Sequence, residues 1–168
     1  ELGLELDQAY ELFNNYHGKV PFVKELSKQV SHVASTRGYI KTLLGRKRRF
    51  DLWEPRDEWG QKAYPLSEAS VKYHKQELKR AYTHTALNAL IQGSSADITK
   101  AAMLKIWEDG YLDYIDLKLT IHDELDFSVD QLQQKCLNEA IHIMKNCVEI
   151  SVPLEVDVEK GSNWGTAK

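Results

Sequence analysis

The sequence has few features of a membrane protein or of a small protein stabilised by disulfide bonds. No apolar run approaches the roughly 18 residues that a membrane-spanning helix needs, and no signal-peptide pattern follows Glu1. There are only two cysteines, Cys136 and Cys147, and both lie in one stretch that looks helical. Two cysteines on one helix form a poor disulfide pair. We therefore expect no membrane partner, and two core thiols in a reducing cytosol.

What is present suits one domain, or a large piece of one. The chain has 168 residues, of which 42% are hydrophobic, which is enough for a packed core. Residues 1–100 carry 16 Lys and Arg against 12 Asp and Glu, whereas residues 101–168 carry 6 against 13. The basic excess gathers at Arg37, Lys41 and residues 46–49. It fits a solvated surface, attraction to the acidic part, or a phosphate contact beside a cation site.

The first half of the chain predicts helices, a short hairpin and a loop. Apolar spacing and Pro21 predict helices over 5–17 and from about 21 to 37, with Gly38 ending the second. Residues 39–44 and 48–52 read as strands around a turn at Gly45. Residues 53–66 read as a loop, a helix begins near Ser67 or Ser70, and a longer helix runs from about 83 to 108.

The second half predicts a hairpin, a helix and a last strand. Residues 116–121 and 125–129 alternate in polarity, which predicts two strands with Leu117, Leu119 and Ile121 on one face and a three-residue tip at 122–124. Asp130 and Gln133 open the next helix, and 152–158 reads as a strand. The buried side of that helix is expected to carry Leu132, Cys136, Ala140, Ile143 and Cys147. The class is α+β, with helices packed on a small antiparallel sheet.

The hairpin tip is a candidate metal site. Asp123 and Glu124 project from two strands with apolar inner faces, and close carboxylates repel unless a cation lies between them. Hard oxygen ligands of this kind suit Mg²⁺, and two-metal phosphoryl transfer needs such ligands together with a further carboxylate from another segment. The alternative is an ordinary hydrated hairpin tip. Alternation makes Asp126 a plain outward strand residue.

A polar stripe marks the long helix. His84, Asn88 and Gln92 are four residues apart and share one face, while Leu87, Ile91, Ile98 and Ala102 lie mostly on another. A row of amide donors could sense the acceptors that recur in the DNA minor groove without reading sequence. Gly93 costs about 1 kcal/mol in mid-helix relative to Ala, which a close approach of a backbone or duplex would explain. The alternative is a solvent-facing stripe with a mild kink at Gly93.

Four segments stand out in order along the chain: RGYIKTLLGRKRR (37–49), ALNALIQGSSADITKAAM (86–103), IHDELDFSV (121–129) and VEKGSNWGTAK (158–168). Together they resemble the family A DNA polymerases, the group of bacterial repair polymerases and many phage replicases. The resemblance covers nearly the whole chain. It implies a polymerase palm-like fold with part of the fingers: residues 1–50 would be the fingers helices after motif B and the following strand hairpin. Residues 51–168 would be a palm portion with the minor-groove helix, the motif C hairpin and a C-terminal strand.

The resemblance also implies roles for particular residues. Asp123 corresponds to the metal-binding aspartate of motif C, Glu124 to its accessory acid, and His122 would lie near the primer terminus. The expected DNA contacts are His84, Asn88 and Gln92 in the minor groove, and Arg46, Lys47 and Arg48 at the backbone. Two positions depart from the family: His84 replaces the arginine of the commonest bacterial form, and Lys168 stands where the family often ends in His.

Two of the family's motifs are absent: the Asp-Tyr-Ser of motif A, with the second metal aspartate, and the nucleotide-binding helix of motif B. We therefore expect a C-terminal fragment or subunit of a phage-type DNA polymerase, inactive alone and in need of an N-terminal part with both motifs. The complete enzyme would act in the bacterial cytoplasm or nucleoid on primer-template DNA. It would add dNTPs to a primer 3′-OH by two-metal phosphoryl transfer with two Mg²⁺ ions. The alternatives are a non-catalytic DNA-binding module that keeps the palm fold, and a metal-dependent nuclease, which needs more clustered carboxylates than we find.

Overall fold

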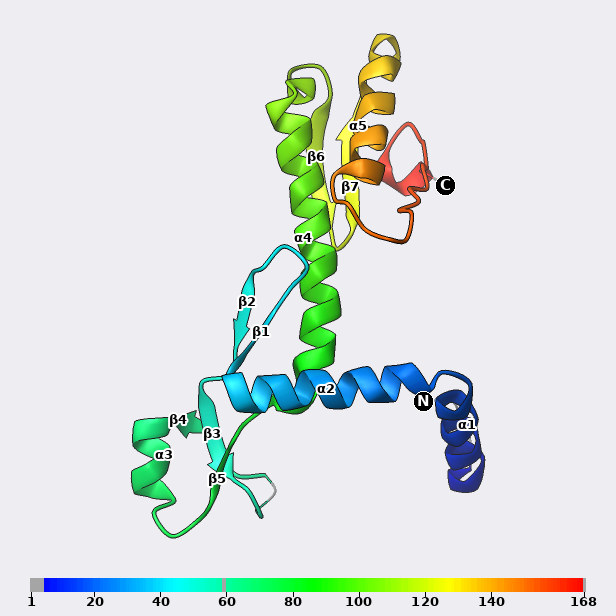
Figure 1. Ribbon diagram of the computed structural model, residues 1–168. Helices are drawn as coiled ribbons and strands as arrows, with labels where there is room; N and C mark the ends of the chain where they lie inside the picture. The colour runs from blue at the N-terminus through cyan, green and yellow to red at the C-terminus, as the bar shows by residue number, and fades with distance from the viewer. Residues whose placement is uncertain (1–4, 59, 168) are drawn as a thin grey trace. The chain divides into compact units, whose positions relative to one another are not determined.

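The computed structural model describes residues 5–58 and 60–167, and the chain divides into two compact units, residues 1–93 and 94–168 (Figure 1). Residues 1–4 of the predicted fingers segment and Lys168 of the C-terminal motif lie outside the described residues. Helices and small antiparallel sheets make up both units, which confirms the predicted α+β class. This division does not test the assignment of residues 1–50 to the fingers and 51–168 to the palm, which stays a prediction.

Two helices open the first unit, as the apolar spacing predicted. Helix α1 covers Leu6–Lys19 and α2 covers Pro21–Arg37. Pro21 occupies the first turn of α2, where its missing N–H costs no hydrogen bond. Gly38 ends the helix with a φ of 76°, a left-handed conformation that glycine adopts without a Cβ penalty. The chain then turns directly into a strand.

A short antiparallel hairpin follows these helices. Strand β1 covers Tyr39–Lys41 and β2 covers Lys47–Arg49, with Tyr39 opposite Arg49 and Lys41 opposite Lys47. The turn contains Gly45, whose φ is 87°. The predicted hairpin is confirmed, although its strands are shorter than the predicted ranges 39–44 and 48–52. The residues beyond the ladder form the turn and the exit to the next sheet.

A second sheet lies where the sequence predicted a loop. Strand β3 (Leu52–Pro55) pairs with both β4 (Tyr64–Pro65) and β5 (Leu78–Arg80), and α3 (Leu66–Lys72) follows β4 directly. The loop prediction for 53–66 is therefore wrong at both ends. The composition of residues 53–66, with two prolines and a glycine, does not indicate that β3 has a partner strand. That partner is β5, a later segment of the chain, which pairs with three residues of β3.

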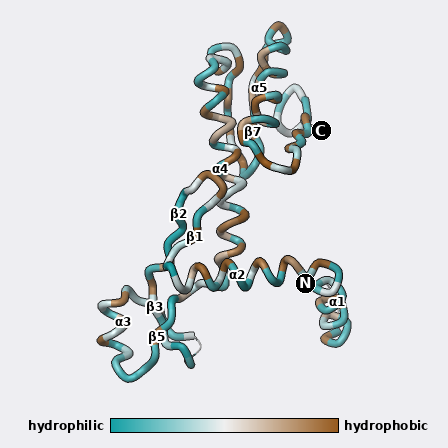
Figure 2. Tube along the Cα trace, in the orientation of Figure 1, coloured by the Kyte–Doolittle hydropathy of each residue, from teal (hydrophilic) through white to brown (hydrophobic). Residues whose placement is uncertain are grey.

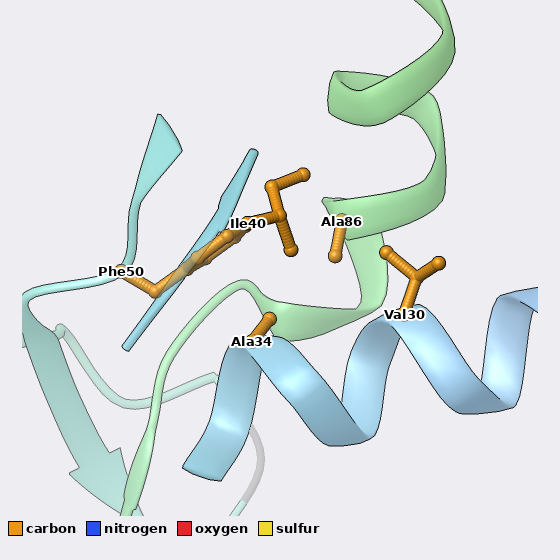
Figure 3. Close-up of a cluster of buried hydrophobic side chains, with 5 residues drawn as sticks. All are labelled: Val30, Ala34, Ile40, Phe50 and Ala86. Atoms are coloured by element: carbon orange, nitrogen blue, oxygen red, sulfur yellow. The ribbon is translucent and has the colours of Figure 1, made fainter. Parts of the chain in front are cut away.

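The core of the first unit joins α2, the hairpin and the start of the long helix. Figure 3 shows Val30 and Ala34 of α2 pointing toward Ile40, Phe50 and Ala86. Ala86 is the first residue of α4 (Ala86–Glu108), which a 3₁₀ turn, η1 (Thr83–Thr85), precedes. The core therefore holds the hairpin and the beginning of α4 on one helix.

The second unit packs helices on a single hairpin. Strands β6 (Asp116–Ile121) and β7 (Glu124–Ser128) are followed by the 3₁₀ turn η3 (Gln131–Gln133) and by α5 (Gln134–Asn146). A 3₁₀ turn, η2 (Tyr111–Asp113), links α4 to β6. The buried cluster comprises Ile106, Ile115, Ala140 and Ile143, and Leu125 and Phe127 of β7 pack against it. One face of the hairpin is thus covered by α5 and by the last turns of α4.

Both cysteines of the second unit are free and half-buried, as predicted. Cys136 and Cys147 belong to the residues packed against the buried cluster. The Cys147 thiol donates to the Ile98 carbonyl at 3.6 Å, and burial raises the pKa of the Cys147 thiol. No helix among the described residues combines the length and apolar character of a membrane span.

Three apolar side chains are exposed: Leu119 and Leu132, which were predicted to be buried, and Ile91, which was predicted to share an apolar face with Leu87. Leu119 is 48% exposed because a register shift between Leu117 and Leu119 moves it to the face opposite Leu117. Leu132 is 90% exposed because it lies in η3 and not in α5. A 3₁₀ turn has three residues per turn, so a spacing of four residues does not place Leu132 on the same side as Cys136. Ile91 is 56% exposed because α4 meets the core through Ala86, Leu87, Ala89 and Leu90 instead.

The predicted last strand over 152–158 is wrong. Residues 153–160 have no regular structure, and a short 3₁₀ turn, η4 (Trp164–Thr166), lies near the end of the described chain. Alternating polarity alone does not make a strand, because an extended segment needs a hydrogen-bonded neighbour. In the part of the chain that is described, β6 and β7 pair only with each other.

Candidate functional site

The tip of the β6–β7 hairpin is shorter than the sequence predicted. Ile121 pairs with Glu124, so only His122 and Asp123 form the turn. His122 has a φ of 53°, the left-handed conformation that tight two-residue hairpin turns require. Asp123 therefore lies in the turn itself and Glu124 is the first residue of β7. Two carboxylates at successive positions end a well-defined ladder.

The tip is held by the apolar face behind it and is open to solvent. Leu125 and Phe127 follow Glu124 on β7 and pack against the buried cluster of the second unit. His122, Asp123 and Glu124 are all exposed, and none of the ion pairs found among the described residues involves them. The hairpin thus presents both acids on a supported backbone, with oxygens free to accept a cation.

Asp126 lies on the outward face of β7, as alternation predicted, but it is half-buried and not fully exposed. It pairs with Leu119 across the sheet and lies on the face opposite Leu125 and Phe127. The side chain is half-buried, and its Oδ2 atom is buried with no hydrogen-bond partner. A buried carboxylate oxygen without a hydrogen-bond donor lowers the stability of the fold. This face of β7 therefore carries an unsatisfied hydrogen-bond acceptor.

The hairpin can supply part of a magnesium shell. Mg²⁺ is usually bound in proteins through one or two carboxylates, while waters and phosphate oxygens fill the remaining positions. Asp123 and Glu124 match that donor set. Within residues 5–58 and 60–167, no three His, Cys, Asp or Glu side chains come together as a metal site. The residues fit one partial shell and do not supply the larger carboxylate cluster that the nuclease alternative needs.

The predicted polar stripe is exposed as expected. Asn88 and Gln92 lie four residues apart on α4, and His84 lies in η1, just before the helix. The neighbouring Leu87 and Leu90 pack against the core of the first unit and so fix the rotation of the helix. Because His84 precedes the α-helix by a 3₁₀ turn, it does not continue the regular four-residue spacing. The stripe proper is the amide pair Asn88 and Gln92.

The close approach expected at Gly93 is confirmed, and it comes from the chain's own hairpin. Arg46 Nη2 donates to the Gly93 carbonyl at 2.9 Å. A Cβ atom on Gly93 would lie 2.8 Å from Cγ2 of Thr42, closer than real Cβ contacts come. The turn between β1 and β2 therefore sits directly against the helix residue that follows Gln92.

The three basic residues predicted to contact DNA do not share one face. Arg46 donates to Gly93, and the Arg48 guanidinium lies 5.7 Å from the centre of the Phe50 ring. Lys47 Nζ lies 4.8 Å from the centre of the Tyr39 ring, on the other side of the strand. All three side chains are exposed, and β2 is hydrophilic throughout (Figure 2).

Two residues of the basic cluster, outside the predicted DNA-contact set of Arg46, Lys47 and Arg48, share the face of Lys47. Lys41 lies directly opposite Lys47, and Arg49 follows two residues later on β2. Period-two alternation on both sides of the Gly45 turn is the signal that would have placed them on one face with Lys47. Arg80 was also missed: its guanidinium lies 4.6 Å from the centre of the Trp53 ring, and Nη1 donates to the Phe50 carbonyl at 2.8 Å.

Comparison with known proteins gives one consistent result. The sequence pattern of DNA polymerase family A matches residues 1–166. The chain is 39% identical to a DNA-directed DNA polymerase of Pseudomonas phage M6 over 94% of its own length and 20% of the relative's. It is 33% identical to DNA polymerase I of Synechocystis over 100% of its length and 17% of that protein.

A solved structure agrees with these sequence matches. The POL domain of Pol1 from M. smegmatis, in complex with DNA primer-template and dNTP, superposes with a TM-score of 0.74 at 29% identity. The match covers 99% of this chain and 27% of that one. The chain spans about a fifth of the length of the curated relatives.

Proposed function

Because the chain belongs to DNA polymerase family A, we propose that it is the C-terminal, motif C part of a template-directed DNA polymerase. The complete enzyme would add dNTPs to a primer 3′-OH. The observation that carries the proposal is the β6–β7 tip, where Asp123 and Glu124 are adjacent, exposed and supported by a packed apolar face. The primer-template and dNTP held by the similar Pol1 domain support the same reaction.

In this proposal the two acids act as metal ligands. Asp123 is the main ligand and Glu124 the accessory one, and His122 lies near the primer terminus. Asp123 and Glu124 would hold Mg²⁺, which would supply charge stabilisation for the attacking hydroxyl and the leaving pyrophosphate. The role of this chain is to hold the carboxylates at a fixed position, which the two-residue turn and the packing of Leu125 and Phe127 support.

The first unit supplies the DNA contacts. The side-chain amides of Asn88 and Gln92 donate to the purine N3 and pyrimidine O2 atoms that recur in correct base pairs, and His84 adds a further donor. Arg46, Lys47 and Arg48 belong to the segment that meets the phosphate backbone. The second metal aspartate and the dNTP-binding helix come from an N-terminal polymerase portion. The assembled enzyme works in the cytoplasm or nucleoid of a bacterial host.

Primer extension tests the proposal. The chain is assayed alone, with the upstream portion that carries motifs A and B, and as Asp123→Asn with that portion. We expect extension only from the combination, and about a thousand-fold loss with Asp123→Asn. The size follows because a catalytic metal contributes several kcal/mol to transition-state stabilisation, at 1.36 kcal/mol per tenfold in rate. Asp157→Asn changes an exposed acid outside the β6 and β7 strands; it is the matched control and should keep full activity.

Each alternative has its own outcome in this assay. Extension by the chain alone would contradict the need for an N-terminal portion. Duplex binding without extension in every combination would favour the non-catalytic DNA-binding module. An Asp123→Asn enzyme as fast as the Asp157→Asn control would remove the hairpin from the reaction.

A further inference from the structure

We propose that Tyr64 is a nucleophilic phenol and a site of covalent modification, whose oxygen takes up an acyl group from an activated acyl donor. The residue lies where β4 meets α3, in the three-stranded sheet of the first unit. The proposed polymerase function uses no residue of this sheet. The inference therefore goes beyond that function and does not rest on it.

The junction between β4 and α3 brings a lysine back to the tyrosine. Tyr64 is the first residue of β4, Pro65 is the last, and α3 begins at Leu66 with no loop between them. Helix α3 has only seven residues and ends at Lys72. A helix of this length makes about two turns, and its last side chain reaches back to the strand that precedes it.

Lys72 meets the phenol through two contacts. Its Nζ atom donates to the Tyr64 hydroxyl oxygen at 2.5 Å and lies 4.3 Å from the centre of the same ring. A hydrogen bond from a charged donor is short and strong, and it favours the ionised form of the group that accepts it. This bond is the main cause that lowers the pKa of the Tyr64 phenol, and it raises the pKa of Lys72.

The other groups around Tyr64 do not cancel the effect of Lys72. Lys62 Nζ lies 5.3 Å from the centre of the Tyr64 ring and also lowers the pKa of the phenol. Partial burial raises this pKa, as does Glu68 of α3, whose effect is the smallest. Trp53, which lies opposite Tyr64 on β3, carries no charge. The net effect of these surroundings is to favour the phenolate.

The phenol is held in place and is still reached by solvent. The centre of the Tyr64 ring lies 6.2 Å from that of the Tyr73 ring, and the Tyr73 hydroxyl donates to the Lys62 carbonyl at 2.9 Å. Tyr73 is buried, whereas Tyr64 is half-buried and Lys72 is exposed. A fixed and partly exposed phenol can meet an acyl donor without a change in the fold.

Acyl transfer to Tyr64 needs no further reactant. With N-acetylimidazole as the donor, the phenol oxygen attacks the carbonyl carbon, so a C–O bond forms and the C–N bond to imidazole breaks. The leaving imidazole takes up a proton, the phenol loses one, and nothing is oxidised or reduced. A nucleophile with a lowered pKa is the more reactive one near neutral pH. Lys72 keeps its proton because its pKa is raised, so it competes poorly as an amine.

Acetylation rates of single tyrosines in the 168-residue chain provide the test. The chain is treated with N-acetylimidazole at a series of pH values, and mass spectrometry quantifies each acetylated peptide. Tyr114 is the internal reference, because it is 60% exposed and access alone would favour it over the half-buried Tyr64. At pH 7.5 we expect Tyr64 to react about threefold faster, since a charge contact at the surface changes an equilibrium by a small factor. The rate at Tyr64 should also level off at a lower pH, because its phenolate is fully populated earlier.

Substitutions of Lys72 separate the effect of the donor from that of access. Lys72→Met removes the ammonium and should lower the Tyr64 rate to that of Tyr114 or below, with its plateau at higher pH. Lys72→Arg keeps a charged donor and should retain most of the rate. Lys75→Met changes an exposed lysine just beyond α3; it is the matched control and should leave Tyr64 unchanged. Circular dichroism melts of all variants report whether the fold is kept.

Treatment with hydroxylamine identifies the atom that carries the acetyl group. Hydroxylamine cleaves the acetyl ester of a tyrosine and leaves the acetyl amide of a lysine intact. The peptide that contains Tyr64 should therefore lose its acetyl group. The peptide that contains Lys72 should carry less of the resistant acetyl group than the one that contains Lys75.

Several results would overturn the proposal. They are a Tyr64 rate no higher than that of Tyr114, a Tyr64 rate that a folded Lys72→Met variant leaves unchanged, and a resistant acetyl group on Lys72 in place of Tyr64. The first comparison uses the wild-type chain alone, so it decides even if a variant fails to fold. Failure of the proposed function is a separate result, because primer extension and its Asp123→Asn loss do not involve the junction between β4 and α3.

Discussion

At the residue scale, the low helix propensity of Gly93 in α4 is offset by its contacts with the turn between β1 and β2. Glycine in mid-helix costs about 1 kcal/mol relative to alanine. The space above Gly93 is filled by Thr42, which is 7% exposed, and the Gly93 carbonyl accepts from Arg46. The residue is therefore required by the approach of the hairpin turn.

We predict that Gly93→Ala destabilises the protein by about 1–2 kcal/mol in a urea titration. The methyl group would meet a buried, β-branched side chain, and overpacking costs about 1–3 kcal/mol, which exceeds the gain in helix propensity. Gly18→Ala in α1 is the matched control, because nothing lies within 4 Å of its Cβ position. The control should stabilise by about 0.5 kcal/mol. Equal effects of the two substitutions would show that the turn does not press on the helix.

At the element scale, Arg80 links the three-stranded sheet to the hairpin within the first unit. Its Nη1 donates to the Phe50 carbonyl at 2.8 Å, and its guanidinium lies 4.6 Å from the centre of the Trp53 ring. A Cβ atom on Gly38 would come within 2.7 Å of this guanidinium carbon, so the left-handed cap of α2 also makes room for Arg80. One side chain thus joins β3, β5 and the exit of β2.

We predict that Arg80→Ala lowers the free energy of unfolding by about 2 kcal/mol. A hydrogen bond from a charged donor contributes about 1.5–3 kcal/mol, and the stacking on Trp53 is lost as well. Lys79→Ala, on the same strand, is the control and should cost less than about 1 kcal/mol, because its ion pair with Glu54 is long, at 3.8 Å, and partly exposed.

The conservative variant sharpens the Arg80 prediction. Arg80→Lys should recover less than half of the loss, since an ammonium cannot stack as a planar guanidinium does. Full recovery by lysine in the same urea titration would mean that charge alone explains the residue.

At the scale of the whole molecule, the proposed metal site is incomplete within the described chain. The β6–β7 tip offers two carboxylates, and no third His, Cys, Asp or Glu among the described residues joins them. The chain corresponds to about a fifth of its curated relatives. Two carboxylates alone fit the proposal that an N-terminal polymerase portion supplies the second metal-binding aspartate.

We predict that 10 mM MgCl₂ stabilises the isolated chain by less than about 0.5 kcal/mol in thermal melts. We expect two carboxylates to bind Mg²⁺ with a dissociation constant of about 10 mM or weaker, and a ligand present at its dissociation constant contributes only about 0.4 kcal/mol. Asp123→Asn should remove this small effect, and EDTA should change nothing further. Stabilisation above about 2 kcal/mol would show that a full metal shell exists in the chain alone.

The sequence predicted the elements whose determinants are local. The helices over 6–19 and 21–37, the cap at Gly38 and the hairpin that carries Asp123 follow from short-range periodicity and from Pro and Gly. The predictions failed where the structure depends on pairing between strands that are far apart in the chain, or on a local irregularity within a strand. Strand β3 depends on β5, the segment 152–158 finds no ladder partner, and the register shift in β6 turns Leu119 outward.

The sequence by itself determined the family motifs, the adjacent acids at the hairpin tip and the amide pair on the long helix, because these depend on residue type and spacing of a few positions. Only the tertiary structure decided which basic residues share a face, what fills the space at Gly93 and what Arg80 joins. The physical reason is that contacts between segments far apart in the chain depend on strand register and close packing, which no local pattern encodes.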